Sequence, residues 1–223
     1  GVLQRYGLTP AILEGAGATR GGPVVDLVAL ARSENVVPTL RRAELLQKLL
    51  GLLALNQNRH VILIGPAGVG RTSLVLSLAA MVAAGECPLH LASIMQIAER
   101  VLLDDPAKAL DNSLRRAQEG ILFLPHIHRF FGGRLDAEFY EASTPLRKAL
   151  LSDRVVIIGS TDQASYDRLM AKNTVIIEHT HPLVVPPASV EETVAILRLH
   201  RPKVERDYQV EIAPEVLETA AQM

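Results

Sequence analysis

One short segment carries the clearest chemistry in the sequence. Residues 65–72 read Gly-Pro-Ala-Gly-Val-Gly-Arg-Thr and lie between an apolar run at 60–64 and a segment of helical character. Closely spaced glycines let successive backbone N–H groups wrap a phosphate chain, and the start of the next helix adds partial positive charge. The Thr72 hydroxyl would bind Mg²⁺. The alternative is an ordinary glycine turn. We expect nucleotide contacts from Gly65, Pro66, Ala67, Gly68, Val69, Gly70, Arg71, Thr72 and Ser73.

Arg71 departs from the usual chemistry of such a loop. A lysine at this position places a compact ammonium between the β- and γ-phosphates, and a planar guanidinium on a longer stem replaces it poorly. Nucleotide affinity should therefore fall. The backbone amides still supply many of the contacts to the phosphates, so we expect ATP or ADP, with Mg²⁺, to bind weakly if at all.

The elements around this loop follow an α/β pattern. Short apolar runs rich in β-branched residues alternate with helical stretches, which is typical of a doubly wound parallel sheet. We predict five strands, at 60–64, 89–92, 121–124, 155–158 and within 174–185. We predict helices at 41–55, 72–84, 94–103, 107–118 and 145–151.

The chain divides into three parts by composition. Residues 1–40 contain glycine clusters that suit a linker with little room for regular structure, and 41–185 form the large α/β domain. Two prolines at 186–187 close the sheet, because proline cannot continue a ladder. Ser189 and Glu192 form a capping-box pattern that opens a partial helical lid at 186–223. We predict lid helices at 190–201 and 214–222.

Four segments in this order resemble the first AAA+ domain of the ClpA, ClpB and ClpC chaperone family. They are 65–72, Ile-Leu-Phe-Leu-Pro-His-Ile-His at 121–128, Gly-Ser-Thr-Asp at 159–162 with Tyr166, and 189–198. The resemblance covers most of the chain from Arg41 onward. It implies a P-loop NTPase fold with the start of a small helical lid.

The resemblance also exposes two lost catalytic positions. In the family, the strand that ends here at Leu124 is followed by an aspartate that organises Mg²⁺ and a glutamate that polarises the attacking water. Pro125 and His126 stand at these positions. Proline carries no charge, and a neutral imidazole is a weaker base beside a phosphate than a carboxylate.

Further family positions are changed. The paired arginines that reach the neighbouring subunit's γ-phosphate align with Glu178 and His179. Loss of such a finger costs roughly 10³ to 10⁵ in rate. The polar residue that senses the γ-phosphate falls at Thr161 or Asp162, and Thr161 could still serve. The region of the family's pore loop, at 99–105, contains no aromatic residue to grip a polypeptide.

These departures predict a degenerate, hydrolysis-deficient AAA+ domain, a pseudo-ATPase with a structural or protein-interaction role inside a larger AAA+ assembly. The expected partners are proteins, either copies of this chain or an active AAA+ subunit. One alternative is an active ATP-dependent unfoldase or disaggregase in which Arg71 and His126 take altered roles. Another is an adapter that has lost nucleotide binding.

Composition excludes several other classes. The formal net charge of −1 gives no field that would draw the chain to nucleic acid or to a membrane surface. We expect no membrane span, and the single cysteine, Cys87, favours a reducing cytoplasm.

Several polar groups favour a surface role over a site. His126 and His128 could form a metal site only with His60 or Cys87, and we expect no structural metal. The arginine pair at 41–42 is typical of a solvated helix face. We expect the same of the acidic residues Asp104, Asp105, Asp162, Glu191 and Glu192.

Overall fold

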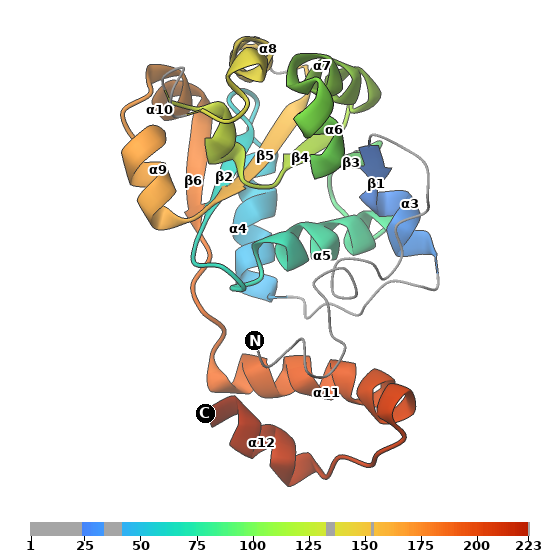
Figure 1. The fold of residues 1–223 in the computed structure, drawn as a ribbon. Coiled ribbons are helices and arrows are strands. Elements are labelled where there is room, and N and C mark those ends of the chain that lie inside the picture. Colours follow the sequence, from blue (N-terminus) through green and yellow to red (C-terminus); the bar gives the residue numbers. More distant parts are fainter. Residues whose placement is uncertain (1–23, 34–41, 133–136, 153, 223) are drawn as a thin grey trace.

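A six-stranded sheet organises the chain. The computed structural model describes residues 24–33, 42–132, 137–152 and 154–222 (Figure 1). The order across the sheet is β1-β3-β4-β5-β2-β6, with β1 antiparallel to β3 and the other five strands mutually parallel. The strands are β1 (Val24–Asp26), β2 (His60–Ile64), β3 (Ile94–Ile97), β4 (Ile121–Leu124), β5 (Val156–Thr161) and β6 (Thr180–Val184).

Helices cover both faces of this sheet, as expected for a doubly wound fold. Val61 and Leu63 of β2 face one apolar cluster, while Ile62 and Ile64 face the other. The first cluster contains α3 (Leu27–Arg32), α4 (Ala43–Leu53) and α5 (Arg71–Ala83). The second contains α6 (Glu99–Asp104), α7 (Pro106–Arg116), the 3-10 helix η1 (Ile127–Phe130), α8 (Tyr140–Leu150), α9 (Gln163–Leu169) and α10 (Thr174–His179).

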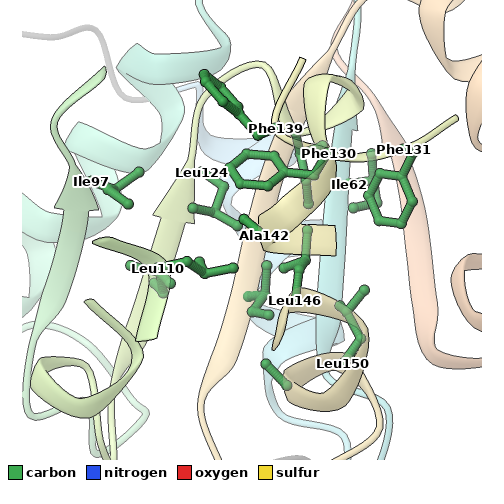
Figure 2. Close-up of a cluster of buried hydrophobic side chains, with 14 of the residues drawn as sticks. Ile62, Ile97, Leu110, Leu124, Phe130, Phe131, Phe139, Ala142, Leu146 and Leu150 are labelled. Carbon is green, nitrogen blue, oxygen red and sulfur yellow. The ribbon is translucent and has the colours of Figure 1, made fainter. Parts of the chain in front are cut away.

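Phenylalanine side chains lie over the carboxyl end of the sheet in the second cluster. Figure 2 shows Phe130 and Phe139 beside Leu124 of β4, and the ring centroids of the two phenylalanines are 5.1 Å apart. Phe130 is buried and belongs to η1, the helix that follows β4 along the chain after a short turn. Burial of one such side chain contributes about 1.5–3 kcal/mol. This packing fixes the path of the chain past the end of β4.

Two helices form the partial lid. α11 (Val190–Tyr208) and α12 (Pro214–Gln222) lie apart from the sheet and are joined to β6 by a connecting segment (Figure 1). The predicted capping box is confirmed: the Glu192 N–H donates to Ser189 Oγ at 3.1 Å, and Glu192 Oε2 accepts from the Ser189 N–H at 3.0 Å. Within the described part of the chain, no helix is long and apolar enough to cross a membrane.

The third strand was predicted in the wrong place. The strand is not 89–92, and the helix expected over 94–103 is divided into β3 and α6. Pairing with β4 decides this, because Ile94 and Gln96 align with Ile121 and Phe123 in parallel register. Both runs are short and apolar, and local composition alone cannot choose between them.

The amino-terminal part also differs from the prediction. We expected little regular structure before residue 41, but Val24–Asp26 forms β1 and Leu27–Arg32 forms α3. The sheet therefore has six strands instead of five, one of them antiparallel. Leu27 and Val28 are buried, which supplies the free energy that orders the segment. The remainder of 1–40 lies outside the described residues, and the boundaries at 40 and 185 stay predictions.

Two helices contain prolines at positions where we expected one helix to begin and the other to end. α8 begins at Tyr140 with Pro145 inside it, and α11 continues past Pro202 to Tyr208. Proline removes one intrahelical hydrogen bond and clashes with the preceding turn. Packing outweighs this in α8, where Ala142 is fully buried.

Candidate functional site

The predicted phosphate-binding segment, Gly65–Ser73, connects β2 to α5, and we call it the nucleotide loop. Its first residue, Gly65, lies between the carboxyl ends of β5 and β6. The Gly65 N–H donates to the Thr161 carbonyl at 3.2 Å, and a Cβ at Gly65 would lie 2.6 Å from the Val185 carbonyl oxygen. Only glycine allows this close approach. The loop therefore starts at the carboxyl edge of the sheet, where ligands of open α/β sheets bind.

The start of α5 is built to receive an anion. Gly70 caps the helix with φ of +97°, a left-handed conformation that glycine adopts without strain. Within the described residues, no side chain accepts a hydrogen bond from this helix end, and Thr72 and Ser73 are exposed. Free N–H groups and the helix dipole at such an end attract phosphate. The start of α5 therefore has the features that phosphate-binding helix ends share.

Arg71, the first residue of α5, has a buried donor without a hydrogen-bond partner among the described residues. Its Nη1 atom is buried, and no described residue accepts a hydrogen bond from it. Burial lowers the pKa of Arg71, and the negative charge of Asp162 partly opposes that shift. The guanidinium stays charged, because the ordinary arginine pKa lies far above neutral pH. Arg71 therefore offers an anion a positive charge and a buried donor.

The acidic positions expected for Mg²⁺ and water activation hold no carboxylate. Pro125 and His126 directly follow β4; Pro125 is half-buried and His126 is exposed. His126 has φ of +53° and ψ of 42°, a left-handed conformation that few residues other than glycine adopt. Mg²⁺ prefers carboxylate oxygens and water. The Thr72 hydroxyl would hold the ion, but the end of β4 does not fit it.

Thr161 and His128 meet beside the loop. The Thr161 hydroxyl lies 2.9 Å from His128 Nδ1, and Thr161 is fully buried at the end of β5. Burial lowers the pKa of His128, which favours its neutral form, while the charge of Asp162 acts in the opposite direction. The hydroxyl that we expected to sense a terminal phosphate is therefore already partnered inside the protein.

Asp162 differs from the solvated surface residue that we predicted. It is half-buried and caps α9, where the Ser165 N–H donates to Oδ1 at 2.8 Å. That hydrogen bond is the main reason why the pKa of Asp162 lies below its usual range. The carboxylate is ionised near neutral pH, and its negative charge acts to raise the pKa of both Arg71 and His128.

Glu178 and His179 do not join this group. They end α10, next to the amino-terminal start of β6, whereas the nucleotide loop follows the carboxyl end of β2. His179 Nδ1 lies 3.0 Å from Asn58 Oδ1, and Glu178 is exposed. Neither residue carries the permanent positive charge that a phosphate contact from one subunit to another would need.

The remaining predicted features lie elsewhere. The segment at 99–105 is largely helix α6, and Leu103 on it is 64 % exposed. His60 is buried and its Nδ1 accepts from the Ile157 N–H at 2.9 Å. Across the described ranges there is no group of three histidine, cysteine or acidic side chains that could hold a metal ion.

Sequence reasoning missed the role of Arg42, which we expected on a solvated helix face. Its side chain is only 12 % exposed. It pairs with Glu192 of the lid and donates from Nη1 to the Pro186 carbonyl at 2.8 Å. Arg42 and Glu192 are 150 positions apart, and no local pattern signals their contact.

Comparison with known proteins identifies the family and the fold of the chain. The model of the ATPase family associated with various cellular activities (AAA) matches residues 61–177. The chain is 28 % identical over 207 residues to a probable ATP-dependent Clp protease ATP-binding subunit of Chlamydia pneumoniae, covering 88 % of this chain and 24 % of that protein. It is 30 % identical over 208 residues to the chaperone protein ClpB of Rhodopseudomonas palustris, covering 87 % of this chain and 24 % of that protein.

Solved structures agree as well. The structure of the Hsp104–ADP complex of S. cerevisiae is similar with a TM-score of 0.78 and 26 % identity, covering 89 % of this chain and 36 % of that chain. The extended Hsp104:casein complex gives a TM-score of 0.77 with the same identity and coverage. The chain spans about a quarter of the length of the curated relatives it matches. It therefore belongs to the AAA family of ATPases, as a domain of the Clp type.

Proposed function

We propose that this chain is a hydrolysis-deficient AAA+ domain that binds ATP or ADP weakly and serves a structural or protein-interaction role in a larger assembly. One observation carries the proposal: Gly65–Ser73 forms a glycine-rich turn into the uncapped start of α5, while Pro125 and His126 follow β4 where hydrolysis needs carboxylates. The loop supports binding, and the changed strand end argues against turnover.

Three further features support weak binding without catalysis. Arg71 replaces the compact ammonium, Thr161 is already engaged by His128, and Glu178 and His179 replace the arginines expected by resemblance. Each change removes a separate contribution to stabilising charge on a transferring phosphate. All three changes affect the same step, the transfer of a phosphate. Loss of an arginine finger alone slows that step by about 10³- to 10⁵-fold.

The proposed partners are proteins, either copies of this chain or active AAA+ subunits. The similar Hsp104 structure contains casein, a protein. The small net charge of −1 supports protein partners over nucleic acid or a membrane surface. The cytoplasmic location expected from the single cysteine is part of the same proposal.

Two assays on the purified 223-residue chain test this function. A fluorescent ADP analogue is titrated with and without Mg²⁺, and phosphate release from ATP is followed in parallel. We expect saturable binding that Thr72→Ala weakens mainly when Mg²⁺ is present, and turnover below about 0.1 s⁻¹. Faster Mg²⁺-dependent turnover that Thr72→Ala abolishes would favour the active unfoldase alternative. The absence of any saturable binding would favour an adapter without nucleotide.

A gain-of-function variant separates a degenerate site from an altered active one. Pro125→Asp combined with His126→Glu restores both carboxylates, and Arg71→Lys restores the ammonium. We expect the triple variant to release phosphate at least about tenfold faster than the parent chain, a change of about 1.4 kcal/mol in barrier. If Arg71 and His126 are instead working catalytic groups, the same variant will be slower than the parent chain.

A further inference from the structure

The carboxylate of Asp162 stands beside the nucleotide loop. Asp162 directly follows β5, whose last residue, Thr161, is in register with Ile64 at the end of β2. The next residue along that strand, Gly65, begins the loop and donates its N–H to the Thr161 carbonyl at 3.2 Å. The backbone of Asp162 therefore emerges next to the point at which the phosphate-binding amides begin.

The side chain of Asp162 is held in place by the fold. Oδ1 accepts the Ser165 N–H at 2.8 Å and caps α9, and the residue is half-buried. A capping carboxylate of this kind cannot swing away without leaving the helix end unsatisfied. Its negative charge is thus a permanent feature of this edge of the sheet.

The charge acts where the outer phosphates of a nucleotide bind. The side chain at position 71 of such a loop is the one that reaches the β- and γ-phosphates. The charge of Asp162 acts on both Arg71 and His128, so it would also act on an anion bound by Arg71. Two negative charges in that space repel each other, more strongly in a partly buried setting than in water.

We propose that Asp162 makes this site selective for nucleoside diphosphates, because its carboxylate repels the terminal phosphate of a triphosphate. The inference rests on the proposed nucleotide binding and deepens it. A diphosphate places no phosphate beside the Asp162 carboxylate, whereas a triphosphate brings additional negative charge next to it. Pro125 and His126, directly after β4, offer no carboxylate that would recruit a neutralising Mg²⁺.

The rival role for Asp162 is that of a magnesium ligand, which would favour ATP instead. Its position after β5 and its use as a helix cap argue against this role. The two roles predict opposite effects when the charge is removed. The variant Asp162→Asn keeps the cap, since asparagine and aspartate cap helices equally well, and neutralises the side chain.

The test measures dissociation constants of ADP and ATP for the 223-residue chain, by competition with a fluorescent ADP analogue, in EDTA and in excess Mg²⁺. We expect the parent chain to prefer ADP by about tenfold or more in EDTA. Asp162→Asn should tighten ATP by about tenfold and change ADP by less than about threefold. The control is Asp167→Asn, an exposed aspartate on the same helix α9, which should change neither constant.

Three results would overturn the inference. An unchanged ATP-to-ADP ratio in Asp162→Asn rejects charge repulsion while nucleotide binding stands. Weaker ATP binding by that variant only in Mg²⁺ identifies a metal ligand. No binding of either nucleotide by either protein rejects the proposed function itself. A second measurement needs no variant: added salt should reduce the ADP preference of the parent chain, because ions screen the repulsion, and a salt-independent preference contradicts it.

Discussion

Arg42 and Glu192 form a two-point ion pair between the sheet domain and the lid. Arg42 Nε lies 3.1 Å from Glu192 Oε1, and Arg42 Nη2 lies 3.0 Å from Glu192 Oε2. The same guanidinium donates to the carbonyls of Pro186 and Pro187, at 2.8 and 3.3 Å. One side chain at the start of α4 therefore holds the connecting segment and the first turn of α11 together.

Arg42→Ala should loosen this junction. The variant leaves two carbonyls and a carboxylate without their charged donor, and we expect the free energy of unfolding to fall by about 1–2 kcal/mol. Arg42→Lys should be intermediate, because an ammonium cannot make the two-point contact. Urea denaturation measures the loss, and limited proteolysis near residue 187 reports opening of the segment. Arg115→Ala, at an exposed position on α7, is the matched control; equal losses for the two alanine variants would contradict the role.

The same pair predicts a pH dependence. The hydrogen bond from Arg42 is the largest cause that lowers the pKa of Glu192, aided by the Ser189 N–H and opposed by burial and by the charge of Glu191. The resulting stabilisation is fully present above the unfolded pKa of about 4.3 and is lost as pH falls through the lower folded pKa. Glu192→Gln should therefore be less stable than the parent chain near neutral pH. Urea melts should show this difference shrinking toward about pH 3, and a constant difference would contradict the assignment.

Arg71→Lys should strengthen nucleotide binding. An ammonium fits between phosphates better than a guanidinium, and we expect the dissociation constant for ADP to fall by about tenfold, or about 1.4 kcal/mol. Arg71→Ala should weaken binding below that of the parent chain, since Nη1 is a buried donor without a described partner. Titration with a fluorescent ADP analogue measures both effects. Arg168→Lys, at an exposed position on α9, should change nothing.

The left-handed backbone at His126 should decide which residues the position accepts. A β-branched side chain is disfavoured at φ of +53°, so His126→Val should lose about 1–2 kcal/mol of stability. His126→Gly and His126→Asn should remain close to the parent chain, because both residues adopt this conformation readily. Thermal or urea unfolding of the three variants checks the order. Equal stability for valine and glycine would show that this conformation is not maintained in solution.

Much of the fold follows from local sequence. The strands at 60–64 and 121–124 were predicted at their observed bounds, because their apolar runs are unbroken and rich in β-branched residues. The third strand was not, because a choice between 89–92 and 94–97 depends on pairing with β4. The ends of α8 and α11 were missed at Pro145 and Pro202, because a local rule against proline ignores tertiary packing.

The candidate site was predictable only where it is contiguous. Gly65–Ser73 is one segment, and its glycines identify it without any other part of the chain. Asp162 and Arg42 were both expected on solvated surfaces. Arg42 contacts Glu192, 150 positions away, and the charge of Asp162 acts on Arg71, about 90 positions away. One sequence carries no signal for such long-range proximity.

The short strand β1 covers the edge of β3 on one side of the sheet. It runs antiparallel along β3, with Val24 opposite Ile97 and Asp26 opposite Met95, and so occupies the hydrogen-bonding groups of that strand. A shorter version of the domain that began at α4 would uncover this row. Exposed strand edges recruit other chains and lead to aggregation. A truncated form of this domain should therefore retain Val24–Arg32, because its removal is expected to cause self-association.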